Sequence, residues 1–311
     1  MQLDIIALGE PLIEFNQAPG DRNGTFYGLG HGGDTSNAVI AAARQGARTG
    51  YFTALGQDAF GDEFLDLWRR EGVDASRVLR DPVAHTGIYF VTHGPKGHVF
   101  SYMRAGSAAS RLAPEALPLD YIATPKFLHI SGISQAISAS ACDAVFAAID
   151  HARANGVRIS YDTNLRLKLW PLARARAITH ATIPFCDVIF PSLEDAGVLT
   201  GRDDPDDMVD FYLELGTPIV ALKLGREGAL VATRDERRRV PGIPVETVDA
   251  TGAGDTFDGA FLAMLVRGKS PFEAALYANV AAALSTQGFG AVASIPMQAQ
   301  VLEFLAREEI E

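Results

Sequence analysis

The sequence predicts an α/β fold in which a mainly parallel sheet carries helices on both faces. Short apolar runs typical of buried strands recur between residues 5 and 222. Helical patterns that end at a glycine lie between many of these runs. Strands that alternate with helices in this way pair in parallel, because each helix carries the chain back across the sheet.

The predicted elements follow in chain order. Buried strands are expected at residues 5–8, 51–55, 127–130, 157–161, 188–190 and 219–222. Helices followed by a glycine that can end them are expected at 35–45, 62–71 and 140–155. After Pro241 the pattern becomes helical, with helices at 255–267 and 271–287 and a last helix that has Pro296 near its first turn.

Two segments break the alternation of strands and helices. Residues 12–30 carry two short apolar runs, and residues 86–104 have the pattern of two strands around a Gly-Pro-Lys-Gly turn. Neither hairpin is long enough to bury a core of its own. We therefore predict that they form one small sheet, a lid, over one end of a single domain that spans residues 1–311.

The composition excludes several classes of function. The chain has 27 Lys and Arg against 38 Asp and Glu, a net charge of −11, whereas binding to phosphate-rich surfaces needs a basic face. No apolar run approaches the roughly 18 residues of a membrane span, so we expect neither nucleic acid nor a membrane as a partner. Cys142 and Cys186 lack the spacing of a zinc site or a disulfide framework, which fits the reducing cytoplasm.

The strongest chemical signal is the run Asp-Ala-Thr-Gly-Ala-Gly-Asp at residues 249–255. Apolar residues at helical spacing follow it, so its glycines lie at the start of a helix. Unpaired amides at a helix start attract anions, which predicts a phosphate site at Gly252, Ala253 and Gly254. Asp255 is then placed to accept the proton of a substrate hydroxyl. The alternative interpretation is an aspartate that caps a helix after a glycine turn.

With this motif the chain resembles the ribokinase-like carbohydrate kinases of the PfkB family. The family's C-terminal signature, Asp-x-x-Gly-Ala-Gly-Asp at a helix start, matches residues 249–255, and its N-terminal signature is present at residues 32–37. Residues 55–61 follow in the expected order, so the resemblance covers essentially the whole chain. It implies a ribokinase-like fold with a β-sheet lid, Asp255 as the catalytic base, ATP and Mg²⁺ as cofactors, and a homo-oligomer that acts on a small molecule.

Two positions of the family pattern differ in this chain. Ala250 replaces the commoner Thr or Pro of the C-terminal signature. The family often has Asn-x-x-Glu where this chain has Ser192 to Asp195, so we assign no metal ligand. Many relatives hold a monovalent cation near the position of Asp249, and the sequence leaves open whether this chain does.

The lid segment resembles that of the 2-keto-3-deoxygluconate kinases within this family, where a Tyr-Tyr-Arg segment holds the substrate. Here Tyr102 and Arg104 flank Met103, which replaces the second tyrosine, and Tyr89 lies on the paired strand. Arg104 presents a planar fork that suits a carboxylate, although it could also be a surface arginine at a strand end. The predicted substrate-binding residues are Gly33, Tyr89, Tyr102, Arg104 and Arg166.

The predicted nucleotide-binding residues come from three further segments. Residues 161–170 are similar to the Asp-x-Asn-x-Arg run of the same kinases, which implies that Asn164 and Arg166 lie beside the transferred phosphate. The turn that the family uses beside the nucleotide contributes Lys223, Gly225 and Gly228. Asn279 is a further candidate near the adenine. Each segment could instead have only a structural role, in a turn, at a helix start or in a salt bridge.

Together these features predict an ATP-dependent kinase that phosphorylates the terminal hydroxyl of 2-keto-3-deoxygluconate, the step before aldol cleavage in Entner–Doudoroff-type routes. The nearest alternative is a family kinase for a neutral sugar such as fructose or ribose, which would give Arg104 no anionic partner. A non-catalytic sugar-sensing protein on the same fold is the alternative from another class. Asp255 and its glycines argue against that alternative.

Overall fold

A large central sheet organises the molecule, which we describe from a computed structural model of residues 2–17, 26–94 and 97–308. Its eight strands are ordered β14-β13-β12-β11-β10-β9-β1-β4. They are β1 (Ile5–Leu8), β4 (Thr49–Phe52), β9 (Phe127–Ser131), β10 (Arg158–Asp162), β11 (Val188–Ile189), β12 (Val220–Lys223), β13 (Gly228–Ala232) and β14 (Arg237–Pro241). Six neighbouring strands pair in parallel, in the order β12, β11, β10, β9, β1 and β4. At the β12 edge, β13 and β14 continue the sheet as an antiparallel hairpin.

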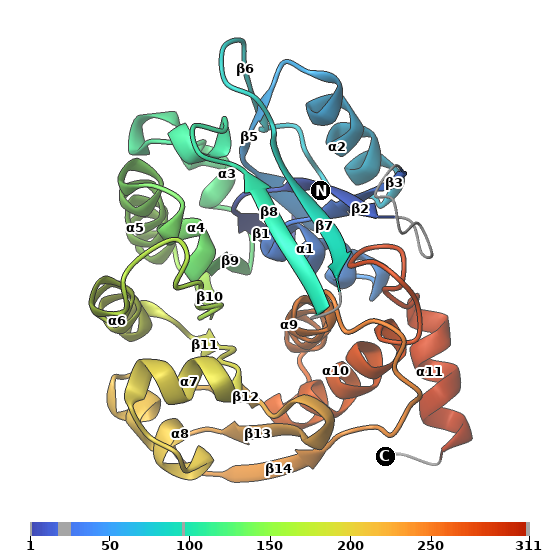
Figure 1. The fold of residues 1–311 in the computed structure, drawn as a ribbon. Helices are drawn as coiled ribbons and strands as arrows, with labels where there is room; N and C mark the ends of the chain where they lie inside the picture. Colours follow the sequence, from blue (N-terminus) through green and yellow to red (C-terminus); the bar gives the residue numbers. More distant parts are fainter. Residues whose placement is uncertain (1, 18–25, 95–96, 309–311) are drawn as a thin grey trace.

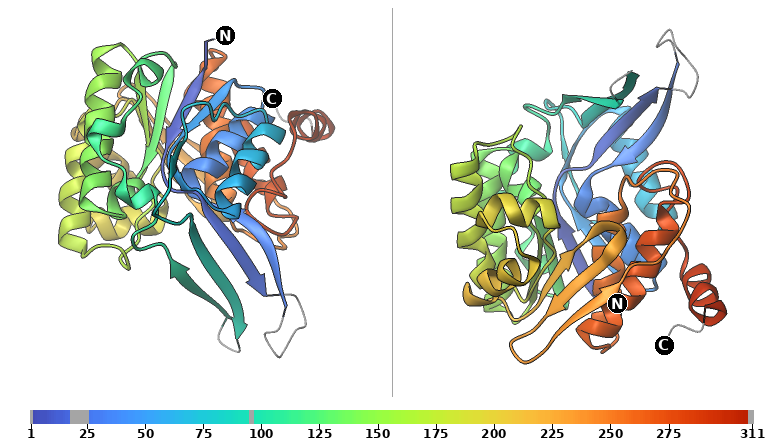
Figure 2. Two further views of the ribbon diagram at one scale, coloured as in Figure 1. Left: turned by 90° about the horizontal axis from the view of Figure 1, so that it is seen from above. Right: turned by 60° about the horizontal axis from the view of Figure 1, so that its bottom comes forward.

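Helices cover both faces of this sheet (Figures 1 and 2). One face carries α1 (Asp34–Arg44), α2 (Ala59–Arg70), α9 (Ala253–Val266), α10 (Pro271–Ser285) and α11 (Gln298–Arg307). The other face carries α3 (Leu119–Ile122), α4 (Gly132–Ala136), α5 (Ala139–Ala154), α6 (Leu172–Thr182), α7 (Leu193–Thr200) and α8 (Pro205–Glu214). None of the helices in the described ranges combines the length and the apolar character that a membrane span requires.

Each face of the sheet buries its own apolar cluster. Phe190 on one face meets Phe261 of α9 edge to face, with ring centroids 5.2 Å apart. Tyr161 and Ile149 lie in the cluster on the opposite face, beneath α5. The packing of α9 against the sheet fixes its first turn at the sheet's edge, where the predicted catalytic residue lies.

The lid is a second, four-stranded sheet that projects from the main body (Figure 2, left). Its strands are β2 (Leu12–Gln17), β3 (Tyr27–Gly32), β7 (Gly87–Gly94) and β8 (Gly97–Met103), in the order β3-β2-β7-β8. The two hairpins join through parallel pairing of β2 with β7. The strands of the two predicted hairpins therefore do form one sheet, and residues 18–25 and 95–96, which connect the strands of each hairpin, lie outside the described residues.

The predicted α/β class, with a mainly parallel sheet, helices on both faces and a small β lid, is confirmed. The run at residues 51–55, predicted as one strand, is divided between β4 and β5 (Ala54–Gly56), because the chain leaves the main sheet to pair with β6 (Leu79–Asp81). The sequence patterns did not predict α7 and α8, although both begin at visible capping side chains, Ser192 and Asp204.

Candidate active site

The predicted site residues gather at the edge of the sheet where the parallel strands end. Glu10 lies two residues after the end of β1, Asn164 lies two residues after the end of β10, and β12 ends at Lys223. Helices α1 and α9 begin at the same edge, as Asn37 and Asp255 show by their contact. Open α/β sheets bind their ligands at this edge, because loops and helix N-termini converge there.

Asp255 lies in the first turn of α9, partly buried against α1. Its Oδ2 accepts a hydrogen bond of 2.8 Å from Asn37 Nδ2. Burial, and then the negative charge of Asp34, raise the pKa of Asp255 to about 7, while Asn37 and Lys223 act in the opposite direction. A carboxyl group with a pKa near 7 can both accept and release a proton near neutral pH.

The first turn of α9 offers free backbone amides. Gly252 begins the helix without a side-chain cap. Within the described ranges, the amides of Gly252, Gly254 and Asp255 donate no hydrogen bond to the protein, whereas Ala253 donates to the Ala250 carbonyl at 3.2 Å. Open amides at a helix start form a site for an anion. The predicted phosphate site thus has its available donors at 252, 254 and 255, and the Ala253 amide is already engaged.

Asp34 and Asn37 received no assignment from the sequence, yet both lie beside Asp255. Asp34 Oδ2 accepts a hydrogen bond of 3.0 Å from Asn164 Nδ2. In the described part of the chain, the buried Oδ1 atoms of Asp34 and Asn37 have no partner. Buried acceptors without partners suit the hydroxyl groups of a sugar. The signal was available, because both residues belong to the N-terminal signature at 32–37.

Asn164 is held in an unusual backbone conformation. Its φ is 32°, a positive value that residues other than glycine rarely adopt. Its amide donates to Asp162 Oδ1 at 3.2 Å while its side chain reaches Asp34. Strain of this kind persists where surrounding contacts impose it, and it is common at functional sites.

Lys223 lies beneath the glycine loop rather than open to solvent. Its Nζ is 3.1 Å from Asp258 Oδ1 and 3.3 Å from Asp162 Oδ2. The same Nζ lies 3.5 Å from the point that a Cβ on Gly254 would occupy. The ammonium group is therefore close to the predicted phosphate site, but two carboxyl groups already hold it.

The tyrosines that the resemblance implied both lie on the lid, where they stack. Tyr89 and Tyr102 have ring centroids 5.6 Å apart, and Tyr102 is 44% exposed. The Tyr89 hydroxyl donates to Glu14 Oε2 at 2.5 Å. Glu14 was not predicted, although alternation along β2 places it opposite Tyr89. Burial, then the charge of Glu14, raise the pKa of Tyr89, and the charge of Asp255 adds to the shift, so this lid residue lies near the predicted catalytic residue.

Arg104 has an anionic partner within the protein. Its Nε donates to Glu10 Oε2 at 2.7 Å, its Nη2 also pairs with Glu10, and Ser107 Oγ donates to Glu10 Oε1 at 2.5 Å. Burial raises the pKa of Glu10, and Arg104 and Ser107 oppose that shift. The argument that only an anionic substrate could balance a buried Arg104 is therefore wrong, because Glu10 balances it. Among the described residues, Arg104 Nη1 has no protein acceptor and is available to a ligand.

Arg166 and Gly33 lie at the same edge of the sheet and differ in how closely the protein surrounds them. Arg166 is exposed and donates to the Leu165 carbonyl, and its charge acts on Asp34 and Asp195. Gly33 precedes α1 with a φ of 113°, and a Cβ there would lie 2.7 Å from the Glu10 carbonyl oxygen. Gly33 therefore allows the close approach of β1 and α1.

The turn after β12 combines an open glycine with a packed one. A Cβ on Gly225 would meet nothing within 4 Å, whereas one on Gly228 would lie 2.2 Å from the Val240 carbonyl oxygen of β14. The need for glycine at 228 is thus explained by packing. Asn279 Nδ2 donates to the carbonyls of Val240 and Pro241 at 3.1 and 3.0 Å, so its side chain anchors the end of β14.

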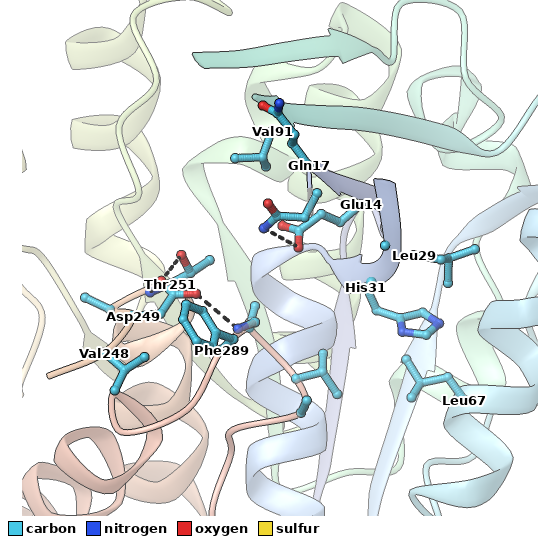
Figure 3. Close-up of a pocket in the computed structure, with 18 of the residues that line it drawn as sticks. Glu14, Gln17, Leu29, His31, Leu67, Val91, Val248, Asp249, Thr251 and Phe289 are labelled. Carbon is cyan, nitrogen blue, oxygen red and sulfur yellow. Dashed lines mark hydrogen bonds between the residues drawn. The ribbon is translucent and has the colours of Figure 1, made fainter. Parts of the chain in front are cut away.

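A cavity of about 1100 Å³ lies between the lid and the loops around residues 248–251 and 289–293 (Figure 3). Glu14 and Val91 of the lid face Asp249, Thr251 and Phe289 across it. Asp255, Arg104 and Lys223 do not line this cavity. It adjoins the candidate site through Glu14, which contacts Tyr89. The predicted catalytic residue Asp255 and the open amides of α9 belong to the polar cluster beside this cavity.

Two glycine variants separate the shape of the loop from its chemistry. Gly252 has a φ of 78°, and a Cβ there would lie 2.9 Å from the Ala291 backbone. A Cβ on Gly254 meets only Lys223 Nζ at 3.5 Å. Gly252→Ala should lower both turnover and the melting temperature, because it adds backbone strain and a clash. Gly254→Ala should leave the melting temperature unchanged or higher, since alanine has a higher helix propensity than glycine. Thermal melts and steady-state rates would measure both effects, and equal melting temperatures for the two variants would contradict the geometry.

Comparison with known proteins supports the same interpretation. The model of the pfkB family of carbohydrate kinases matches residues 3–298. A 2-dehydro-3-deoxygluconokinase of Thermoproteus tenax is 36% identical over 97% of this chain and 94% of its own length. The enzyme of the same name from Bacillus subtilis is 32% identical over 99% of this chain and 97% of its own. A probable fructokinase-4 of Arabidopsis thaliana is 32% identical over 97% of this chain and 96% of its own.

Among solved structures, an E. coli protein described as a ribokinase II and crystallised with ATP and Mg²⁺ superposes with a TM-score of 0.91 at 28% identity, covering 98% of this chain and 99% of that one. The family match extends from β1 to the start of α11, so it includes the central sheet, the lid and both signatures. The chain belongs to the pfkB family of carbohydrate kinases, as the ribokinase-like fold and the glycine loop before Asp255 had indicated.

Proposed function

We propose that the protein transfers the γ-phosphoryl group of ATP to the terminal hydroxyl of 2-keto-3-deoxygluconate, also called 2-dehydro-3-deoxygluconate. The observation that carries the proposal is the first turn of α9. There a carboxyl group with a pKa of about 7 adjoins amides that have no acceptor within the described chain. This arrangement suits a reaction in which a hydroxyl loses a proton as a phosphoryl group arrives.

Each group at the site has a role in this reaction. Asp255 accepts the hydroxyl proton, and Asn37 holds its carboxylate in place. The amides of Gly252, Gly254 and Asp255 stabilise the charge on the transferred group. Arg166 lies near Asp34 on the exposed side, where its guanidinium can meet phosphate oxygens. Asn164 fixes this segment, and Gly225 leaves room beside the turn for a nucleotide.

Magnesium fits the site as part of the nucleotide complex. In the ranges that the structure describes, no group of three or more His, Cys, Asp or Glu side chains is arranged to hold a metal ion by itself. Mg²⁺ would therefore be held mainly by ATP oxygens and water, where it neutralises phosphate charge. A monovalent cation near Asp249 would sit beside a carboxylate that accepts hydrogen bonds from Thr251 and from the Gly290 amide.

The proposed substrate class follows from the lid. Arg104 Nη1 has no acceptor within the described residues, and Tyr102 is 44% exposed beside it on the lid, a combination that suits a sugar carboxylate. Two relatives that match almost the whole chain carry the name 2-dehydro-3-deoxygluconokinase. Cys142 and Cys186 are free and buried, consistent with action in the cytoplasm, and exposed apolar lid residues such as Val99 and Met103 are consistent with a homo-oligomer.

A neutral-sugar kinase is the second candidate, and Glu10 is the observation that favours it. Because Glu10 already balances Arg104, the arginine does not require an anionic substrate. A fructokinase is also among the relatives at 32% identity. A sensor without catalysis is the third candidate, but it has no use for a carboxyl group with a pKa of about 7 beside open amides.

The test is Mg²⁺- and ATP-dependent release of ADP with a panel of sugar acids and neutral sugars, with phosphorus NMR to locate the phosphate on the product. We expect ADP in equal amount to a product phosphorylated at the terminal carbon of 2-keto-3-deoxygluconate. Rapid turnover with fructose alone would establish the second candidate. Sugar binding without ADP release from any substrate would establish the sensor.

A further inference from the structure

A buried cluster of charges beneath the glycine loop has no role in the reaction described so far. Lys223 Nζ lies 3.1 and 3.2 Å from the two carboxyl oxygens of Asp258 and 3.3 Å from Asp162. Asp258 is 1% exposed and Asp162 is 5% exposed, and the Lys223 side chain is 14% exposed. Lysine and aspartate are rarely buried unless they pair, so the three side chains form one structural unit.

This cluster contains one more carboxyl group than it has cations. Burial raises the pKa of Asp258 well above its ordinary value, and the neighbouring Asp162, to which protonated Asp258 can donate a hydrogen bond, adds to the shift. Asp258 is therefore the carboxyl group of this cluster whose protonated form burial favours, and the Lys223 ammonium lies against both carboxyl groups. The pKa of Lys223 is raised by Asp162, Asp258 and Asp255, so its ammonium stays charged.

Asp255 lies near this cluster and near polar side chains of several other elements. Asp34 and Asn37 face it from α1, Asp162 from β10, Lys223 from β12 and Tyr89 from the lid. Asp258 lies one turn further along α9 and also interacts with it. Asp34 and Asp162 disfavour the ionised form of Asp255, whereas Lys223 favours it. Arg166, in the loop after β10, favours the ionised form of Asp34.

We propose that Lys223 is a positioning residue whose ammonium group, fixed by Asp162 and Asp258, keeps Asp255 ionised and ready to accept the substrate proton. This inference rests on the proposed function of Asp255. It gives Lys223 a different role from the nucleotide contact that the family resemblance implied. The geometry supports this role because two carboxyl groups already hold the ammonium, directly below Gly254.

The test compares the wild type with Lys223→Met and with Lys223→Arg, which keeps the charge. The pH dependence of kcat/KM should rise through about 7 in the wild type, where Asp255 ionises. The Lys223 ammonium lowers the pKa of Asp255, and the opposing effect of Asp162 remains when that ammonium is removed. The acid limb of Lys223→Met should therefore move to higher pH, with activity recovering at alkaline pH. Lys223→Arg should keep the limb of the wild type.

A direct titration separates this inference from the proposed function. Carbon NMR of labelled aspartate carboxyl groups, with the Asp255 signal assigned by its loss in Asp255→Asn, reports the pKa of Asp255 whether or not a substrate is known. An upward shift in Lys223→Met supports the inference, even if no sugar is phosphorylated and the proposed function fails. An unchanged titration in an active variant overturns the inference alone. So does a rise in KM for ATP without any shift of the pH profile, because that result identifies a nucleotide ligand.

One further variant guards against loss of the fold. Lys223→Gln is neutral but can donate hydrogen bonds to both Asp162 and Asp258, so it should fold if Lys223→Met does not. Each neutral variant that folds must show an upward shift in the pKa of Asp255. A wild-type titration in Lys223→Gln would show that hydrogen bonding, and not charge, is what Lys223 supplies, and it would overturn the proposal.

Discussion

Asp255→Asn should lower kcat by about 10²- to 10⁴-fold, the usual contribution of a general base. Asparagine keeps the shape of the side chain and can still bond to Asn37, but it cannot accept the hydroxyl proton. KM for sugar and for ATP should change little, since the open amides of α9 remain. Steady-state kinetics at pH 8, where the wild-type carboxyl group is ionised, measures the effect. Asp143→Asn, which alters an exposed carboxyl group on α5, is the matched control.

The same variant should be more stable than the wild type above neutral pH. Because the pKa of Asp255 is raised from 3.8 to about 7, the folded protein favours the protonated form. The stability that this protonation contributes is present at low pH and is lost as the pH rises through about 7. Asparagine does not ionise, so the melting temperature of Asp255→Asn should exceed that of the wild type at pH 8. Near wild-type turnover with an intact fold would contradict the role of Asp255.

The second large effect is expected at Arg104. Arg104→Met keeps part of the stem and removes the fork, so the preference for a sugar acid over a neutral sugar should be lost. Removing one partner of a buried charged pair costs about 2–5 kcal/mol, which corresponds to roughly 30- to 4000-fold in specificity. The effect on fructose should be far smaller. The ratio of specificity constants on the two substrates measures the change.

The contact with Glu10 determines which control this experiment needs. Without Arg104, the buried Glu10 carboxylate loses its cation, and breaking such a pair destabilises a protein by about 3–5 kcal/mol. The double variant Arg104→Met/Glu10→Gln removes that unpaired charge and should recover the melting temperature but not the preference for the acid. Recovery of the preference together with the stability would show that Arg104 only supports the lid.

Much of the fold could be predicted from local patterns. Short apolar runs indicated most strands of the main sheet, and glycines after helical patterns marked the ends of α1, α2 and α5. The lid followed from two segments too short to bury a core. The patterns gave no strand for β13 or β14 and no helix for α7 or α8. The strand predicted at 51–55 is divided because its second part pairs with β6, which lies more than twenty residues further along the chain.

The partners of the site residues could not be predicted, because the pairs lie far apart in sequence. Arg104 and Glu10 are 94 residues apart, and Asn37 and Asp255 are 218 apart. The motifs identified one member of each pair, while the fold supplies the other. Asp258 is the clearest case: in the sequence it is one more residue of the α9 pattern, and only the approach of β12 makes it a partner of Lys223.

The most direct test of the proposed activity is the ratio of wild-type specificity constants for 2-keto-3-deoxygluconate and fructose, measured with saturating ATP and Mg²⁺ at pH 8. A guanidinium that reads a carboxylate through Nη1 should favour the acid by at least about 30-fold, the lower bound for a buried charged contact. An equal or higher specificity constant for fructose would contradict the assignment of a sugar acid and would establish Arg104 as the partner of Glu10 alone.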